Sequence, residues 1–302
     1  MQQNNQINKN KQVVLENKFP ASEKRIAVVI GMPISHSLSP VIHNYFLKQQ
    51  NIDGGYSAIA VEPNNLKLTI DRFIAEGYAG FNVTIPYKEK VFSLCQDCSE
   101  IARITSAVNT VVIKDGKLFG DNSDGWGFIC GLKQEIPLIS LKGKNALLIG
   151  AGGASRSIAY SLIKEGCNVV VLNHNVGRAL NLLDSLIDTA RNFGVKIDAD
   201  SLDRYQDKLP NVDLLINATP LGMTGYKPLD LDLSLLPQEA IVSDIVYNPL
   251  ETLLLKRAGA RGNKVVGGLN MLANQALVGF RSWFGGNPVV DDSLMELLKG
   301  RL

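Results

Sequence analysis

Polar side chains able to take part in proton transfer occur at the ends of predicted strands in the first half of the chain. The segment NVTIPYK (residues 82–88) ends a strand and begins a helix, and alternation places Asn82 and Thr84 on one face. Lys88 follows in the first helical turn, where its ammonium group is a candidate proton donor. Asn109, in AVNT, and Asp124, in GDNSDG, add an amide and a carboxylate. Taken singly, Lys88 also fits a solvated lysine and Asp124 a turn or helix-cap residue.

Two serines, Ser37 and Ser39, stand two positions apart at the predicted entrance of a helix, in GMPISHSLSP (residues 31–40). Hydroxyl donors combined with the positive end of a helix dipole form an anion site, and a carboxylate would suit it. The alternative is that Ser39 is a simple N-cap, followed by Pro40 at the first helical position, and that Ser37 has no role.

A glycine-rich loop follows an apolar strand and opens a helix in the second half. It consists of Gly150, Ala151, Gly152, Gly153, Ala154 and Ser155. Gly150 and Gly152 match the first two positions of GxGxxG, and the small residue Ser155 stands at the third. In this strand–loop–helix context the pattern predicts a dinucleotide pyrophosphate site at the helix N-terminus. The alternative is a tight turn in a fold that binds no nucleotide.

The residues after the next strand bear on which dinucleotide binds. An Asp or Glu about 20 residues beyond the loop binds the ribose 2′-hydroxyl of NAD, but this chain has Asn173, His174 and Asn175 there. Arg178 follows one turn later. A missing acid and a nearby arginine favour a 2′-phosphate, and therefore NADP. Arg178 is otherwise an ordinary surface residue of the helix.

The amino-acid composition excludes several classes of protein. The 302 residues contain 31 lysines and arginines and 29 acids, a net charge of +2, which gives no reason to bind nucleic acid or an anionic membrane. Hydrophobic residues make up 45%, which excludes global disorder, and no apolar run approaches the ~18 residues of a membrane span. At ~150 residues per domain, the length predicts about two domains. We expect an enzyme acting on a small molecule, with no nucleic-acid or membrane partner.

Neither the N-terminal segment nor the cysteines change this expectation. Residues 1–24 are rich in Asn, Gln and Lys and lack the apolar core of a secretory signal, so we interpret them as a mobile tail of a cytoplasmic protein. One CxxC, at residues 95–98, falls short of the four ligands of a structural zinc site, and the histidines are scattered. We therefore expect reduced thiols and no metal.

Strand and helix signals alternate along the chain, as in βαβ units. In the first half, strands are predicted at 25–30, 56–61 and 80–85, helices from 39, over 63–75 and from 86, and a hairpin over 108–119 that turns at Asp115-Gly116. In the second half, strands at 146–149, 168–172, 212–217 and 241–246 alternate with helices at 155–165 and 178–193. Helices at 271–284 and 293–298 follow.

Eight segments together identify a family resemblance. In chain order they are SHSLSP, NVTIPYK, AVNT, GDNSDG, GAGGAS, INATPLGM, DIVYNP and GGLNMLANQ. With these segments the chain resembles the shikimate dehydrogenase family over nearly all of residues 25–302. The resemblance implies a reversible NADPH-dependent reduction of 3-dehydroshikimate to shikimate in chorismate and aromatic amino acid biosynthesis.

The resemblance also implies roles for individual residues. Lys88 and Asp124 form the catalytic pair and contact substrate, and Ser37 and Ser39 hold the substrate carboxylate. The other implied substrate residues are Asn82, Thr84, Asn109, Tyr247 and Gln275. The implied cofactor residues are the loop Gly150, Ala151, Gly152, Gly153, Ala154 and Ser155, the adenosine-end residues Asn173, His174, Asn175 and Arg178, and also Thr219, Ile245, Gly268 and Met271.

The expected fold class is α/β, with an N-terminal α/β substrate domain and a Rossmann-fold dinucleotide-binding domain. We place the first domain at residues 25–123, completed by C-terminal helices over 273–302, and the second at 124–272, with the active site in a cleft between them. The protein would act as a monomer or homodimer.

One position departs from the family pattern, which commonly has Asn-Arg-Thr where this chain has Asn173-His174-Asn175. The missing arginine is a main partner of the 2′-phosphate in that pattern. A broader quinate/shikimate dehydrogenase that uses NAD is therefore an alternative. A non-catalytic sensor on the same fold is another, but it predicts altered residues at positions 88 or 124.

Overall fold

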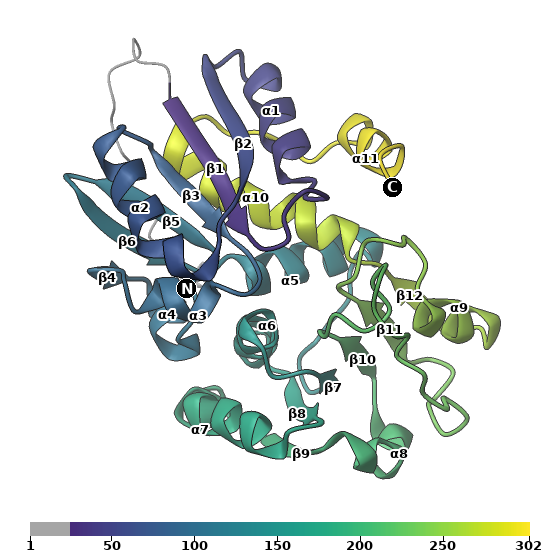
Figure 1. The fold of residues 1–302 in the computed structure, drawn as a ribbon. Coiled ribbons are helices and arrows are strands. Elements are labelled where there is room, and N and C mark those ends of the chain that lie inside the picture. Colours follow the sequence, from purple (N-terminus) through teal and green to yellow (C-terminus); the bar gives the residue numbers. More distant parts are fainter. Residues whose placement is uncertain (1–24) are drawn as a thin grey trace, which may run out of the picture.

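The structure is a computed structural model and describes residues 25–302. The mobile tail predicted for residues 1–24 lies outside the described residues. Two six-stranded sheets organise the chain, one in each half of the sequence (Figure 1).

The first sheet has the strand order β2-β1-β3-β5-β6-β4. Strand β5 runs antiparallel to its neighbours β3 and β6, whereas the other pairs are parallel. The predicted β5–β6 hairpin is confirmed, because Asp115 and Gly116 both adopt positive φ at its turn. The elements of this half are β1 (Arg25–Gly31), α1 (Ser39–Gln49), β2 (Gly54–Ala60), α2 (Leu66–Ala75), β3 (Gly80–Val83), α3 (Lys88–Phe92), β4 (Asp97–Cys98), α4 (Glu100–Thr105), β5 (Thr110–Lys114), β6 (Lys117–Asp121) and α5 (Asp124–Glu135).

The second sheet is wholly parallel, in the order β12-β11-β10-β7-β8-β9. This is the strand order of a Rossmann fold, and it leaves the carboxyl ends of β7 and β10 at the switch point where dinucleotides bind. Its elements are β7 (Asn145–Ile149), α6 (Gly153–Lys164), β8 (Asn168–Asn173), α7 (Val176–Phe193), β9 (Ile197–Ser201), α8 (Tyr205–Lys208), β10 (Leu214–Asn217), β11 (Ile241–Asp244), α9 (Leu253–Ala260) and β12 (Lys264–Val266).

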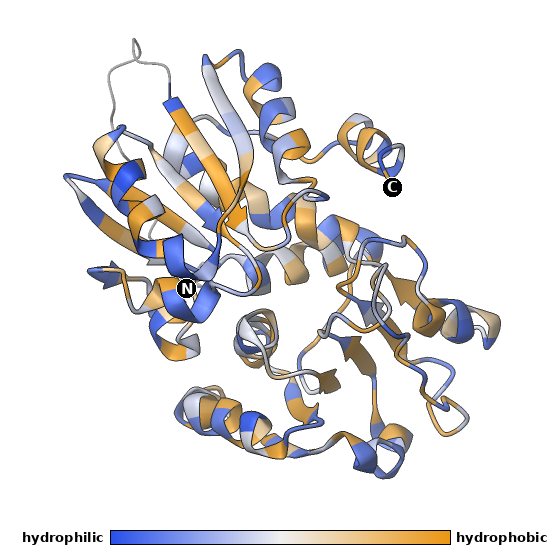
Figure 2. Cartoon of the chain, in the orientation of Figure 1, coloured by the Kyte–Doolittle hydropathy of each residue, from blue (hydrophilic) through white to orange (hydrophobic). Residues whose placement is uncertain are grey.

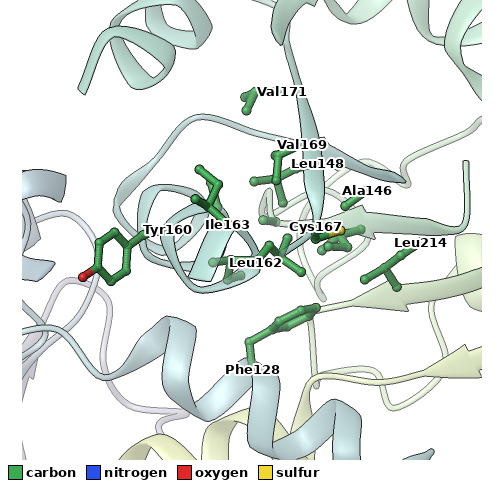
Figure 3. Packing of buried hydrophobic residues seen from close by; sticks show 14 of the residues in the cluster. Phe128, Ala146, Leu148, Tyr160, Leu162, Ile163, Cys167, Val169, Val171 and Leu214 are labelled. Atoms are coloured by element: carbon green, nitrogen blue, oxygen red, sulfur yellow. The ribbon is translucent and has the colours of Figure 1, made fainter. Parts of the chain in front are cut away.

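The inner strands of both sheets are apolar because helices cover both of their faces. Figure 2 shows hydrophobic central strands beside helices of mixed character. In Figure 3, Leu162 and Ile163 of α6 pack with Leu148 and Val169 of the sheet, and Phe128 of α5 points into the same cluster. Helix α5 therefore contributes to the core of the second half.

The chain returns to the first half after β12. Helix α10 (Leu269–Phe284) packs against α1, β1 and β5, and α11 (Asp292–Lys299) packs against α1 and α10 (Figure 1). The fully buried Trp283 donates a hydrogen bond from its ring N–H to the Val111 carbonyl at 2.9 Å. The core of the first half thus includes residues distant in sequence.

Glycines let the backbone of α5 approach its neighbours on two sides. A Cβ on Gly125 would lie 2.1 Å from the Ser157 carbonyl oxygen of α6, and one on Gly127 would lie 2.7 Å from the Gln275 Cβ of α10. Helix α5 is therefore held between α6 and α10, where the two halves meet.

Two local predictions needed correction. Helix α1 begins at Ser39 with Leu38 at the N-cap, so Ser39 is not the cap. Helix α3 begins at Lys88, and Pro86 precedes it in a cis peptide turn after Ile85. The edge strands β9 and β12 and the helix α9 were not predicted. An edge strand buries less of its surface, and Asp198 and Asp200 in β9 weaken the apolar pattern.

Candidate active site

The two candidate proton-transfer residues are in direct contact. Lys88 Nζ lies 2.5 Å from Asp124 Oδ2, although the residues are 36 positions apart in sequence. The side chains are only 16% and 6% exposed, so water screens this ion pair little. Lys88 is the first residue of α3 and Asp124 the first of α5, so two helix starts converge here.

A buried amide network fixes the orientation of the carboxylate. Asn109 Nδ2 donates to Asp124 Oδ1 at 2.7 Å, and Gln275 Oε1 lies 3.3 Å from the same nitrogen. Asn109 Oδ1 accepts from the Ser123 backbone N–H at 2.9 Å. Asp124 thus has one oxygen on Asn109 and the other on Lys88.

Ser123 was not among the predicted site residues. Its hydroxyl lies 3.0 Å from Asn109 Nδ2 and 3.5 Å from Gln275 Oε1, and the residue is fully buried. Its position inside GDNSDG was the only sequence signal for it.

Asn82 is held by a second buried cluster beside the first. Its amide nitrogen donates to the Asn109 carbonyl at 2.9 Å and to Thr110 Oγ1 at 3.1 Å. The Tyr56 hydroxyl donates to Asn82 Oδ1 at 2.5 Å, and burial raises the Tyr56 pKa well above its usual value, so the hydroxyl keeps its proton. These bonds use both amide N–H groups, so Asn82 can meet a ligand only as an acceptor. Tyr56 was also missed from sequence.

Ser37, Ser39 and Thr84 gather at one edge of the first sheet. Strands β1 and β3 pair in parallel, and the serines follow the carboxyl end of β1 whereas Thr84 follows that of β3. Ser37 Oγ accepts from the Ser39 backbone N–H at 3.3 Å. Ser37 and Thr84 are half-buried and Ser39 is buried. The arrangement leaves hydroxyl donors beside the N-terminus of α1.

The glycine loop of the second half lies beside Lys88. Gly150 adopts a φ of +115°, and Gly152 is the N-cap of α6. A Cβ on Gly152 would meet no atom of residues 25–302 within 4 Å, whereas one on Gly153 would lie 3.3 Å from Lys88 Cδ. The open space at Gly152, with the α6 N-terminus behind it, fits a pyrophosphate. Buried Ser155 donates from its hydroxyl to the Ala218 carbonyl at 3.3 Å, which fixes the loop to the strand beside it.

Residues after β10 and β11 lie along the same edge. Thr219 Oγ1 donates to Asn217 Oδ1 at 2.7 Å, and a Cβ on Gly150 would lie 3.0 Å from Thr219 Cγ2. Ile245, Gly268 and Met271 line one small depression. Half-buried Tyr247 packs against the core cluster of the first half, and burial raises its pKa.

Asp244 is a buried carboxylate that the sequence reasoning did not single out. It accepts from Asn217 Nδ2 at 3.0 Å, from the Val246 backbone N–H at 3.0 Å and from Thr252 Oγ1 at 2.8 Å. Burial raises its pKa, whereas these bonds oppose the shift. Asp244 therefore ties together the turns that follow β10 and β11.

The adenosine-end residues lie at and just after the carboxyl end of β8. Asn173 is buried and donates from Nδ2 to the Asn175 carbonyl at 2.9 Å. Asn175 is the N-cap of α7, and its side chain accepts from the Arg178 backbone N–H. His174 and Arg178 are exposed.

Other features of the described chain do not add to this site. A hollow of about 320 Å³ lies at the amino ends of β7, β10 and β11, opposite the glycine loop. Among residues 25–302, all four cysteines are free thiols and no group of His, Cys, Asp and Glu has the geometry of a metal site. No helix in that range is both long and apolar enough to span a membrane.

The fold and site together define a class. A Rossmann-type parallel sheet with its glycine loop against a buried lysine–carboxylate pair is the arrangement of a nucleotide-dependent dehydrogenase with a separate substrate-binding half. The predicted fold class is confirmed.

Comparison with known proteins narrows this class. Residues 29–111 match the family described as shikimate dehydrogenase substrate binding domain, and residues 132–222 match shikimate / quinate 5-dehydrogenase. The chain is 44% identical over 276 residues to the shikimate dehydrogenase (NADP(+)) of Methylocella silvestris, covering 90% of this chain and 95% of that protein. The protein therefore belongs to the shikimate dehydrogenase family.

Solved structures of similar proteins agree with this family assignment. The shikimate 5-dehydrogenase of Thermus thermophilus in complex with NADP(H) and shikimate has a TM-score of 0.79 and 36% identity, covering 92% of this chain and 99% of that chain. A quinate dehydrogenase of Corynebacterium glutamicum in complex with NAD has a TM-score of 0.82 and 31% identity, covering 91% and 99%.

Proposed function

We propose that this protein is an NADP-dependent shikimate dehydrogenase, an oxidoreductase that interconverts 3-dehydroshikimate and shikimate. The observation that carries the proposal is the shielded Lys88–Asp124 ion pair, 2.5 Å long, with the lysine stem beside the glycine loop. A lysine at this position would supply a proton next to the site expected for a dinucleotide, as carbonyl reduction requires. The intact pair argues against a non-catalytic sensor.

The protein's part in the reaction is proton transfer and orientation. NADPH, when bound, supplies the hydride for the substrate carbonyl carbon. The Lys88 ammonium group donates a proton to the carbonyl oxygen as negative charge develops there, and solvent then reprotonates the lysine. Asp124, fixed by Asn109, orients Lys88 and accepts a hydrogen bond from a substrate hydroxyl.

The substrate site would lie along the first sheet's edge. Ser37 and Ser39 donate to the carboxylate, supported by their place at the α1 N-terminus. Ring hydroxyls meet Asn82, Thr84, Asn109 and Gln275, and Tyr247 closes the edge. Asn82 would serve as an acceptor, because its N–H groups are occupied.

The cofactor would extend along the second sheet. The loop from Gly150 to Ser155 holds the pyrophosphate, and Thr219, Ile245, Gly268 and Met271 surround the nicotinamide end. Asn173, His174, Asn175 and Arg178 meet the adenosine, with Arg178 as the charged partner of the 2′-phosphate.

We divide the chain into a substrate domain of residues 25–123 and 273–302 and an NADP-binding domain of 124–272. The packing of α10 on α1 and β1 supports this division, although α5, at its boundary, shares its contacts between α6 and α10. We also propose that the protein is cytoplasmic and that it acts as a monomer or homodimer.

A second candidate is a quinate/shikimate dehydrogenase that uses NAD. His174 favours it, because an imidazole gives a 2′-phosphate less positive charge than a guanidinium at neutral pH.

Steady-state oxidation of shikimate and of quinate, each with NADP and with NAD, tests both candidates. The proposal expects the highest kcat/KM for shikimate with NADP. A higher value for quinate with NAD would replace it with the second candidate.

A further inference from the structure

An acidic residue of the first half lies against the proposed adenosine end of the second. Glu89 is the second residue of α3, directly after Lys88, and its Oε1 lies 3.5 Å from Arg178 Nη2. The two side chains are 57% and 52% exposed, so the contact spans the two halves at the surface. It joins the segment that carries the proton donor to the helix that follows β8.

Arg178 lies in the first turn of α7, just after β8, where the proposed function puts the 2′-phosphate. Its backbone N–H donates to the Asn175 side chain at the start of α7, immediately after the carboxyl end of β8. In a Rossmann fold this point faces the adenosine ribose. The inference made here therefore rests on the proposed function.

A second guanidinium, that of Arg156, interacts electrostatically with the same carboxylate. Arg156 lies in the first turn of α6, and its buried Nε has no hydrogen-bond partner among residues 25–302. Burial lowers the pKa of Arg156, the Glu89 charge raises it and the Arg178 charge lowers it. Glu89 is thus the negative member of a three-charge cluster.

An acid near the end of this strand is a feature of the NAD pattern, and Glu89 brings one to Arg178, five residues after the end of β8. The end of β8 has His174 and no acid, so an acid here comes from the facing half of the molecule instead. A carboxylate can accept a hydrogen bond from the 2′-hydroxyl of NAD, whereas it repels a 2′-phosphate and competes with it for Arg178.

We propose that Glu89 is a specificity-determining residue that weakens the binding of NADP relative to NAD by holding Arg178 and opposing the 2′-phosphate. Because Glu89 follows Lys88 directly, the residue that sets this preference belongs to the half that binds substrate. No sequence pattern of the dinucleotide-binding half contains it.

The test compares two cofactor fragments that differ only in the 2′-phosphate. Dissociation constants of 2′,5′-ADP and 5′-AMP are measured by calorimetry on the full-length protein, its Glu89→Gln variant and a Glu296→Gln control. The control makes the same charge change at Glu296, an exposed residue of α11. For Glu89→Gln we expect 2′,5′-ADP to bind about 3- to 10-fold more tightly, with 5′-AMP unchanged or weaker, and the gain to shrink at high salt.

The possible results distinguish a failure of the role given to Glu89 from a failure of the proposed function. Equal changes for both fragments, no change, or weaker binding of 2′,5′-ADP would overturn the role of Glu89. A similar gain in Glu296→Gln would reduce the effect to net charge and overturn it too. If the unmodified protein binds neither fragment, the proposed function fails, and this inference fails with it. Binding of both without a selective effect of Glu89→Gln overturns the inference alone.

Discussion

At the residue scale, the Lys88–Asp124 ion pair is the feature that points most directly to a proton-transfer reaction. Ion pairs exposed at the surface contribute little to the free energy of unfolding. The Lys88–Asp124 pair differs from them because it is shielded from water and oriented by Asn109. A shielded ion pair is weak support for the stability of a fold, which is consistent with the proton-transfer role proposed for this one.

Removing either member should affect turnover more than binding. We expect Lys88→Ala and Asp124→Asn each to lower kcat by ~100- to 10,000-fold, the usual contribution of general acid–base catalysis, with a smaller change in KM for shikimate. Steady-state kinetics, with circular dichroism as a folding control, checks this. A variant with near-normal kcat would show that the assigned role is wrong.

The two serines should behave differently, because a carboxylate ligand acts in the ground state and the transition state alike. Each lost charge-assisted hydrogen bond costs roughly 1.5–3 kcal/mol, so Ser37→Ala and Ser39→Ala should each raise KM for shikimate about tenfold or more. The measurement is KM and kcat for both single variants and the double variant. An unchanged KM in the double variant would refute the carboxylate site.

Position 174 should tune the cofactor preference. We expect NADP to be preferred over NAD, but less than with an arginine at this position, so His174→Arg should tighten NADP about tenfold and NAD far less. KM values for both cofactors are compared among the parent, His174→Arg and a His174→Gln control. An unaltered NADP/NAD ratio in the arginine variant would mean that the side chain at 174 points away from the phosphate.

At the element scale, the placement of Asp124 depends on how closely α5 packs. Its first turn approaches α6, where the Gly125 backbone N–H donates to Ser157 Oγ at 2.8 Å. We therefore expect the position of Asp124 to depend on side-chain size at the next residue, Gly125.

A methyl group at Gly125 should push this helix start away. A Cβ there would lie 2.1 Å from the Ser157 carbonyl oxygen, so Gly125→Ala should destabilise the fold by ~1–3 kcal/mol and lower kcat by displacing Asp124. Urea unfolding and kinetics measure the two effects. Exposed Gly259 in α9, where a Cβ has room, is the matched control: Gly259→Ala should keep activity and leave stability equal or up to ~1 kcal/mol higher. Equal stability of both variants would contradict the close approach.

At the scale of the whole molecule, the two ligand surfaces proposed above lie on different halves, which are joined through α5 and α10. The hydroxyl site follows strands of the first sheet, whereas the glycine loop follows a strand of the second. Binding to one surface should therefore be separable from binding to the other.

Thermal shifts test this separation. A ligand at 100 times its Kd stabilises the folded state by ~2.7 kcal/mol, which raises Tm by several degrees. We expect shikimate and NADP each to raise Tm of the parent protein, and the Ser37→Ala/Ser39→Ala double variant to lose most of the shikimate shift while keeping the NADP shift. Loss of both shifts in that variant would argue against separate surfaces.

The sequence by itself determined the features that are written locally. Apolar runs marked the inner strands because both of their faces are buried, and the Asp115-Gly116 turn and the GAGGAS loop were recognisable because their backbone geometry demands those residue types. The order of motifs was sufficient to identify the family, which the comparisons confirmed. The roles given to individual site residues stay predictions.

Only the tertiary structure decided which of these residues meet. Asn109 and Gln275 are 166 positions apart, and Glu89 reaches Arg178 from a helix of the other half, so no local pattern relates them. Only buried hydrogen-bond partners make three further residues part of the site region: Ser123, Tyr56 and Asp244. The edge strand β9 forms because β8 is there to pair with it. Periodicity and turn chemistry act over a few residues, whereas contacts between distant segments depend on how complete elements pack. This packing fixes both the Lys88–Asp124 pair and the Glu89–Arg178 contact.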